Sequence, residues 1–401
     1  MSETIKNQIK KVLEAHRDNI AFVIGNGINR YFSPDNCLSW ERLIKDLYVQ
    51  YVGTNDIPNK ENNENELAVT FTELFDLIEL QYYTKDESPF EIMLKRFDND
   101  DSFKKTSNLT SKMELIASNP KIRKTPLSLK SISNLLETDE TYQSLIATSR
   151  QWCEKNMEDA HNMTDSECLH SFMFNASNNT KISIYKNLIK KTVVQRFSSQ
   201  KFSDEMSSFM DKIKAMNAPV LTTNYDSLMS NSLCLSFHKM GKDVTAFYPW
   251  NVYYSDREIL NPSSGFGIWH INGMIKYFQR IKLGISDYMG NVERARRMIH
   301  STDFNDLYNG IPGGRINQNW LHIIFTKNLF IFGLKLEENE VFLRWLLIQR
   351  AKYSKLYHRE LKGWYVDTDI EAGKKFFLEK VGINTINLQD SQDFKNLYES
   401  F

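Results

Sequence analysis

The chain has 401 residues, of which 41% are hydrophobic and 25% charged, so we expect an ordinary globular protein with one large or two modest domains. Its 50 basic and 50 acidic residues give a formal net charge of zero, which favours neither a nucleic-acid partner nor a membrane partner. No stretch approaches the roughly 20 apolar residues of a membrane span, and the first residues lack an apolar signal core. We therefore expect a cytoplasmic protein.

The cysteines and histidines show no spacing that is typical of a metal site. No Cys-x-x-Cys pair occurs among Cys37, Cys153, Cys168 and Cys234, so the sequence predicts no zinc ribbon. Disulfides are not expected in a reducing compartment. The thiols are expected to be buried and structural, and no bound metal is expected.

The first 66 residues predict a helix, a strand, a second helix and a loop, in that order. Apolar residues at helical spacing mark residues 5–13 and 40–47, and Ile20 to Ile24 form a short apolar run that is typical of a buried strand. The polar residues 53–66, with their glycine and proline, predict a loop.

The middle of the chain shows helical patterns and no convincing strand. Helices are expected at residues 67–83, 131–155, 182–197 and 204–216. We interpret residues 53–215 as a large, mostly helical insertion. It separates residues 1–52, the first part of an α/β domain, from the remainder of that domain, residues 216–401.

Strands resume after residue 216 and alternate with helices. Strands are expected at residues 219–223, 267–271, 329–332, 363–366 and 383–388, with helices at 340–353 and 369–381. Short apolar strands that alternate with helices indicate a parallel sheet. The predicted fold class is therefore α/β, with a Rossmann-like parallel sheet.

The first predicted strand runs directly into Gly25-Asn26-Gly27, and a helix-like pattern follows. This is the form of a dinucleotide-binding turn, in which glycines let a phosphate approach the backbone. The amides of Gly25 and Gly27 would then cradle a pyrophosphate, helped by a helix N-terminus. Arg30 replaces the third glycine of the usual fingerprint. A tight turn from strand to loop, without a ligand, is the alternative.

Three later strands also end in polar or glycine-rich segments. These segments are Thr222-Thr223-Asn224-Tyr225-Asp226, His270-Ile271-Asn272-Gly273 and Gly333-Leu334-Lys335-Leu336. Ligands of open α/β sheets bind outside the carboxyl ends of the strands. We therefore expect all four segments to meet at one edge of the sheet.

The order of these segments resembles the sirtuin superfamily, and more closely the SIR2-like proteins of bacterial anti-phage systems. The matching residues are Gly25, Gly27, Thr222, Asn224, Asp226, Gly273 and Gly333. The resemblance implies a fold of the SIR2/DHS-like kind, here with a helical insertion and no zinc ribbon. It also implies an NAD⁺ glycohydrolase that releases nicotinamide and ADP-ribose.

The resemblance assigns roles to residues of this chain. Asn224, His270 and Asp226 are the expected catalytic residues, with His270 as general base and Asp226 holding the ribose. The expected contacts to the dinucleotide are Gly25, Asn26, Gly27, Ile28, Asn29, Arg30, Thr222, Thr223, Asn272, Gly273 and Gly333. NAD⁺ is expected as the substrate, with no further cofactor.

The chain departs from the family pattern at two positions. Asn29 stands in place of the family serine, and Asn272 stands where the family has its catalytic histidine. His270 lies two residues earlier and, because alternate strand residues face the same side, either His270 or Asn272 can take that role. A supporting or core position for His270 remains open, as does a plain helix cap for Asp226. Arg30 contacts a phosphate or pairs with an acidic neighbour.

An unrestrained NAD⁺-degrading enzyme would kill its host, so we expect its activity to be gated by assembly or by a partner. The expected partners are further copies of the chain, or an ATPase or nucleotide-sensing protein from the same operon, with no direct nucleic acid and no membrane. Two other functions stay open: a weakly catalytic module that binds NAD⁺ or ADP-ribose, and a protein deacylase. The missing zinc cysteines argue against the deacylase.

Overall fold

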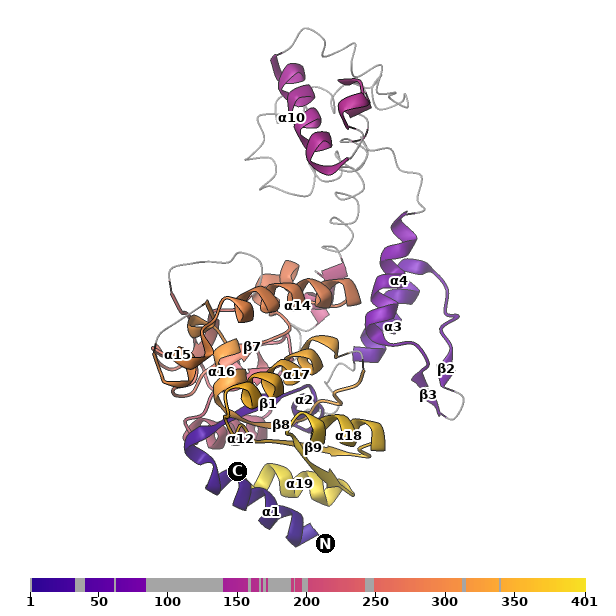
Figure 1. Ribbon diagram of the computed structural model, residues 1–401. Helices are drawn as coiled ribbons and strands as arrows, with labels where there is room; N and C mark the ends of the chain where they lie inside the picture. Colours follow the sequence, from indigo (N-terminus) through magenta and orange to yellow (C-terminus); the bar gives the residue numbers. More distant parts are fainter. Residues whose placement is uncertain are drawn as a thin grey trace. The chain divides into compact units, whose positions relative to one another are not determined.

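The chain forms two compact units, Met1–Asp76 with Lys190–Phe401, and Leu77–Ile189. Figure 1 shows the chain coloured by position in the sequence, from indigo at the N-terminus to yellow at the C-terminus. The computed structural model describes residues 2–32, 40–60, 63–83, 140–157, 160–165, 167–168, 171, 189–190, 192–196, 201–241, 249–311, 315–338 and 340–401.

An eight-stranded sheet forms the centre of the first unit, in the order β10-β9-β8-β1-β4-β7-β6-β5. The strands are β1 Ile20–Ile24, β4 Val220–Thr222, β5 Ser236–Lys239, β6 Val252–Ser255, β7 Ile268–His270, β8 Asn328–Phe332, β9 Gly363–Thr368 and β10 Asn384–Leu388. Numbered along the chain from one to six, the parallel strands β1, β4, β7, β8, β9 and β10 have the order 3-2-1-4-5-6, which is that of doubly wound dinucleotide-binding folds.

The six parallel strands confirm the predicted α/β fold class, but the sheet is mixed. Strand β6 runs antiparallel to both β7 and β5, and neither β5 nor β6 was expected from the sequence. An antiparallel edge needs only one buried face, so its strands need not be apolar throughout. The expectation of a wholly parallel sheet is wrong at this edge.

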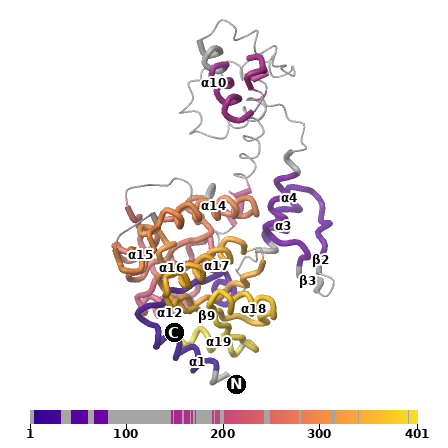
Figure 2. The backbone as a smooth tube through the Cα atoms, in the orientation of Figure 1, coloured from indigo at the N-terminus to yellow at the C-terminus, as the bar shows by residue number. Residues whose placement is uncertain are grey.

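Helices cover both faces of the sheet, as Figures 1 and 2 show. The α-helices are α1 Ser2–Ala15, α2 Gly27–Phe32, α3 Trp40–Val52, α4 Phe71–Tyr83, α10 Glu140–Asn156, α12 Asp204–Ala215, α13 Leu228–Ser232, α14 Ile285–His300, α15 Phe304–Tyr308, α16 Leu321–Thr326, α17 Val341–Leu356, α18 Ala372–Lys380 and α19 Ser391–Glu399. Short 3₁₀ helices lie at Arg17–Asn19, Ala160–Asn162, Ile275–Arg280 and Arg315–Gln318.

Strand β1 shows how the sequence builds three layers. All five of its residues are buried, and successive side chains point to opposite faces. Ala21 and Val23 belong to a hydrophobic cluster with residues of α14, α16, α17 and α18. Ile20, Phe22 and Ile24 belong to another with residues of α1, α12 and α19. A strand that is buried on both faces reads as an unbroken apolar run, and this is why β1 was predictable.

The described residues of the region expected as a helical insertion include a strand pair. Strands β2 (Asn59–Lys60) and β3 (Asn63–Leu67) form an antiparallel pair where the sequence predicted a loop. The helices α4, α10 and α12 lie within segments expected to be helical, whereas residues 84–139 and 172–188 fall outside the described residues. The compact second unit spans Leu77–Ile189, so α3, the β2–β3 pair and α12 belong to the unit that contains the sheet.

The described part of the second unit is organised around α10. Cys153, Ala160 and Cys168 are buried together, and Arg150 pairs with Asp165 at 2.6 Å. The expectation of buried thiols is confirmed for Cys153 and Cys168 but is wrong for Cys234, which is exposed, while Cys37 lies outside the described residues. No described helix combines the length and apolar character that crossing a lipid bilayer requires.

Candidate functional site

A cavity of about 790 Å³ lies at the carboxyl ends of the parallel strands in the first unit; we call it the carboxyl-edge cavity. Its wall is built largely from the segments that follow β1, β4, β7 and β8, together with the last residues of β9. The order of the parallel strands reverses between β1 and β8, which is the position where open α/β sheets bind ligands.

The structure places half of the expected site residues in this wall. The residues that line the cavity are Asn26, Gly27, Arg30, Thr223, Asn224, Asn272 and Gly333. The others are buried outside the lining: Gly25, Ile28, Asn29, Thr222, Asp226, His270 and Gly273. The four predicted segments therefore meet at one edge of the sheet, while some of their side chains support the wall instead of facing the cavity.

The glycines of the first turn allow the loops after β1 and β8 to touch. The Gly25 amide donates to the carbonyl of Phe332 at 3.1 Å, and the Gly27 amide donates to the carbonyl of Gly333 at 2.7 Å. Gly333 has a φ of +69°, a conformation that favours glycine. Because both amides are already bonded within the protein, they are not free to cradle a pyrophosphate as expected. The helix α2 that follows has only six residues.

We expect Gly25→Ala to destabilise the protein. An alanine Cβ would lie 2.4 Å from the carbonyl oxygen of Gly333 and 2.4 Å from Cβ of Leu334, so the backbone must shift. Overpacking of this kind costs about 1–3 kcal/mol in the free energy of unfolding, which urea denaturation measures. Gly290→Ala in α14 is the matched control, because its Cβ meets nothing within 4 Å. An unchanged midpoint for Gly25→Ala would contradict the close approach.

A buried hydrogen-bond network links the turn after β1 to the segment after β4. The side-chain amide of Asn29 donates to Oδ2 of Asp226 at 2.9 Å and to Oδ1 of Asn26 at 3.0 Å. The other oxygen of Asp226 accepts from the amide of Leu228 at 3.0 Å, at the start of α13. Burial raises the pKa of Asp226. Asp226 therefore links Asn29 in α2 to the start of α13, outside the cavity lining.

Asn224 lies in the cavity wall and is held through its backbone. Its amide hydrogen bonds to Oγ1 of Thr222 at 3.1 Å, and its carbonyl accepts from Nδ1 of His270 at 2.7 Å. The side-chain nitrogen is 3.4 Å from the carbonyl of Gly25. The Asn224 amide oxygen has no partner among the described residues, so it is available to a ligand hydroxyl or a water.

His270 and Asn272 occupy different environments. His270 is only 2% exposed, burial lowers its pKa to about 4, and its Nε2 has no hydrogen-bond partner among the described residues. With Nδ1 donating to Asn224, the ring is neutral and does not line the cavity. Asn272 does line the cavity. Asn272 thus lines the cavity, whereas His270 lies outside the lining and hydrogen bonds to the Asn224 carbonyl.

The wall carries two cations that form no ion pair with a described carboxylate, Arg30 after β1 and Lys335 after β8. Two of the acidic side chains in the wall have partners. Glu337 lies 3.4 Å from Nζ of Lys374, and Asp367 accepts from the hydroxyl of Tyr365 at 2.6 Å. Arg30 and Lys335 lie on the segments after β1 and β8, whose loops touch, so this part of the wall carries groups that can bind an anion.

The third acid, Glu340, was not predicted from the sequence. It is partly buried in the wall, directly before α17, and its carboxylate makes no hydrogen bond or ion pair with a described residue. Burial alone raises its pKa to about 7. Its neighbour in the wall is Tyr225, whose hydroxyl donates to the carbonyl of Lys282. Acidic residues are common before helices, so the sequence does not single out Glu340. Its burial in the structure makes it a candidate base.

No group of three or more potential metal ligands occurs among the described residues. A scan against protein-family models and a search of curated proteins found no match to this chain. The resemblance to SIR2-like proteins therefore depends on the residues quoted from the sequence, of which Gly27, Asn224 and Gly333 line the carboxyl-edge cavity.

Proposed function

We propose that this chain is a SIR2-like NAD⁺ glycohydrolase and the effector of a bacterial anti-phage system. The observation that carries the proposal is the carboxyl-edge cavity, which lies at the reversal of the strand order with Asn224 and Asn272 in its wall. Its volume of about 790 Å³ is within the range of cofactor and substrate pockets.

In this proposal the dinucleotide spans the carboxyl ends of the parallel strands. Its pyrophosphate lies against the touching loops of β1 and β8, where Arg30 and Lys335 supply positive charge. Its nicotinamide ribose lies toward β4 and β7, where the amide oxygen of Asn224 accepts from a ribose hydroxyl. Asn272 then faces the nicotinamide end of the ligand.

The reaction breaks the bond between the ribose anomeric carbon and the nicotinamide nitrogen. The pyridinium leaves as neutral nicotinamide and takes the bonding electron pair, so the ribose passes through a state that resembles an oxocarbenium ion. A water oxygen bonds to the anomeric carbon and loses one proton. Glu340 is the proposed acceptor of that proton, because a carboxylate with a pKa of about 7 is matched to proton transfer near neutral pH.

His270 acts in this proposal as a positioning residue. We expect His270→Ala to lower nicotinamide release by about tenfold, because the Asn224 carbonyl loses its buried hydrogen bond and the segment that carries Asn224 loosens. His270→Asn, which restores a donor, should recover part of the rate. Since the His270 pKa is about 4, neither change should alter the pH dependence between about pH 6 and pH 9. A pH profile that flattens in His270→Asn would show that His270 is itself the base.

The deciding experiment incubates the purified chain with NAD⁺ and follows nicotinamide and ADP-ribose by chromatography. Release of both products supports the proposal. Tight binding of NAD⁺ without products would favour a binding module, and acetyl release from a lysine peptide would favour a deacylase. Repeating the assay over a range of protein concentrations, with and without products of neighbouring genes, tests the gating. Full activity of the dilute chain alone would contradict control by assembly or by a partner.

A further inference from the structure

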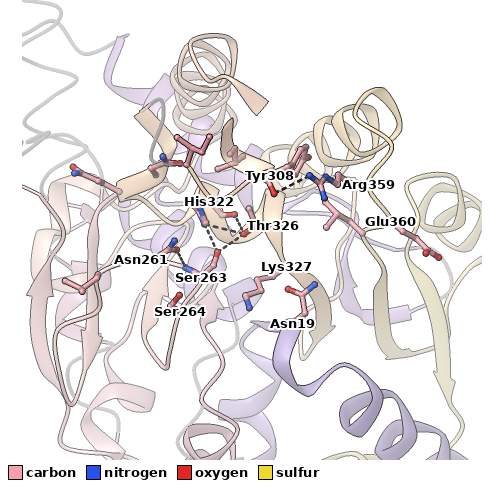
Figure 3. A pocket seen from close by; sticks show the side chains of 17 residues that line it. Asn19, Asn261, Ser263, Ser264, Tyr308, His322, Thr326, Lys327, Arg359 and Glu360 are labelled. Carbon is pink, nitrogen blue, oxygen red and sulfur yellow. Dashed lines mark hydrogen bonds between the residues drawn. The ribbon is translucent and has the colours of Figure 1, made fainter. Parts of the chain in front are cut away.

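A second cavity, of about 600 Å³, lies at the opposite edge of the sheet; we call it the amino-edge cavity. Its wall includes Asn19, directly before β1, and Lys327, directly before β8, both labelled in Figure 3. Leu361, two residues before β9, also lines it. Lys327 and Gly333 flank β8, whose five residues span about 17 Å at roughly 3.3 Å per residue. The two cavities are therefore distinct sites at the two ends of the same strands.

The amino-edge cavity carries two cations that form no ion pair with a described carboxylate. Nζ of Lys327 donates to the carbonyl of Asp18 at 3.1 Å. The guanidinium of Arg359 donates to the carbonyl of Tyr308 at 3.3 Å, and Figure 3 shows both residues at the cavity. The acid of the wall, Glu360, is exposed and lies 3.6 Å from Lys362. The wall itself therefore carries two cations, Lys327 and Arg359, and one acid, Glu360, while the carboxylate of Asp18 acts on Lys327 from outside the wall.

A third cation lies behind the wall. Arg350 is 1% exposed and donates to backbone carbonyls on both sides of the cavity floor, those of Lys327 at 3.1 Å and Leu361 at 3.3 Å among them. No described carboxylate forms an ion pair with it. Arg350 fixes the backbone before β8 and β9 and adds a permanent positive charge behind the cavity, where the low dielectric weakens screening.

The remaining polar wall is neutral and fixed. Thr326 donates to the carbonyl of His322 at 2.6 Å, so the single proton of Ser263 points to Thr326 Oγ1 at 2.7 Å. Nδ1 of His322 then donates to Oγ of Ser263 at 2.6 Å, and burial lowers the pKa of His322 to about 4. The Ser263 proton is not directed at the histidine, which argues against an activated nucleophile and for a rigid binding wall.

The rim of the cavity is apolar and accessible. Leu260 is 98% exposed and Ile311 is 51% exposed, and both line the cavity. Lys327 and Arg359, which form no ion pair with a described carboxylate, and the apolar rim match a ligand with a phosphate at one end and a flat apolar group at the other. We propose that the amino-edge cavity is a second ligand site, which binds a nucleoside phosphate independently of the carboxyl-edge cavity.

Calorimetric titration of the full chain with adenosine monophosphate tests this proposal, with adenosine and inorganic phosphate as partial probes. Arg359→Gln is expected to weaken binding of adenosine monophosphate by at least about tenfold, since it removes a charge-assisted contact at an exposed position. Lys327→Gln combined with Arg359→Gln should abolish it. Lys355→Ala, an exposed lysine of α17 outside both cavities, is the matched control and should bind normally.

Binding of adenosine monophosphate by the Arg30→Gln variant distinguishes this site from the proposed NAD⁺ site, because Arg30 lines only the carboxyl-edge cavity. The amino-edge proposal predicts that Arg30→Gln retains the binding that Arg359→Gln loses. It is overturned if adenosine binds as tightly as the monophosphate, or if the doubly substituted chain, shown to be folded by its thermal midpoint, binds as the parent does. Because the titration measures binding and requires no turnover, it tests the amino-edge site even if the chain releases no nicotinamide.

Discussion

Asn224→Ala should abolish the release of nicotinamide while the protein stays folded. The Asn224 side chain lies in the wall of the carboxyl-edge cavity, and its oxygen has no partner among the described residues, whereas its nitrogen is 3.4 Å from the Gly25 carbonyl. Removal of a group that holds the reacting ribose costs about 10²–10³-fold in rate, as loss of a single preorganised polar group does in other enzymes. The long contact to Gly25 contributes little, so the free energy of unfolding should fall by about 1 kcal/mol or less.

The measurement compares kcat/KM for NAD⁺ with the urea midpoint of the same preparation. Asn231→Ala is the matched control, because Asn231 is an exposed asparagine of α13, which follows the same strand, and it does not line the cavity. It should retain the parent rate. A folded Asn224→Ala protein that releases nicotinamide at the parent rate would remove Asn224 from the mechanism and leave Asn272 as the remaining amide in the wall.

The inner parallel strands β1, β4, β7 and β8 were predictable because burial on both faces leaves a plain signature in the sequence. β1 and β8 are five-residue runs that are buried throughout, and both read as strands without knowledge of the fold. β5 reads Ser-Phe-His-Lys and is exposed or partly exposed along its length, so its pairing with β6 depends on a tertiary neighbour that a local pattern does not contain. The short β2–β3 pair, in which Leu67 is the only apolar residue, was missed for the same reason.

The convergence of the four site segments followed from topology, but the direction of each side chain did not. Carboxyl ends of parallel strands meet at one edge, so Asn26, Asn224 and Asn272 were expected together and line one cavity. His270 and Asn272 were predicted to share a side by strand alternation. β7 ends at His270, however, and beyond a strand end alternation no longer fixes the direction of a side chain. Asn272 therefore lines the cavity wall, whereas His270 is buried outside the lining.

Glu340 could not be predicted because its sequence context is ordinary. Acidic residues are common before helices, and Glu337 and Glu338 in the same loop satisfy the same pattern. What separates Glu340 from them is partial burial without a partner, a property that arises only when the loop after β8 packs against Tyr225 from the β4 segment. Perturbed carboxylates of this kind concentrate at functional sites, which makes Glu340 the most informative residue to change.

Glu340→Gln should lower kcat/KM for NAD⁺ by about 10²–10⁴-fold, the range over which general acid–base groups contribute. In the parent protein the rate should rise with pH until Glu340 is ionised, and level off above about pH 7. The glutamine variant should lose that dependence along with most of its rate. Glu338→Gln, an exposed neighbour outside the cavity wall, is the matched control and should keep both the rate and the pH profile.

The same substitution has a second readout that does not depend on activity. The Glu340 carboxyl has a pKa of about 7 when folded and an ordinary value of 4.5 when unfolded, so between these values the folded state binds more protons. Stability contributed by Glu340 is therefore present at low pH and is lost as the pH rises toward 7. The difference in unfolding free energy between Glu340→Gln and the parent should therefore be more favourable to the variant at pH 8 than at pH 5. Urea denaturation of both proteins at both pH values measures it. A variant that lost activity but showed no such relative gain would mean that Glu340 is not a buried, ionising base.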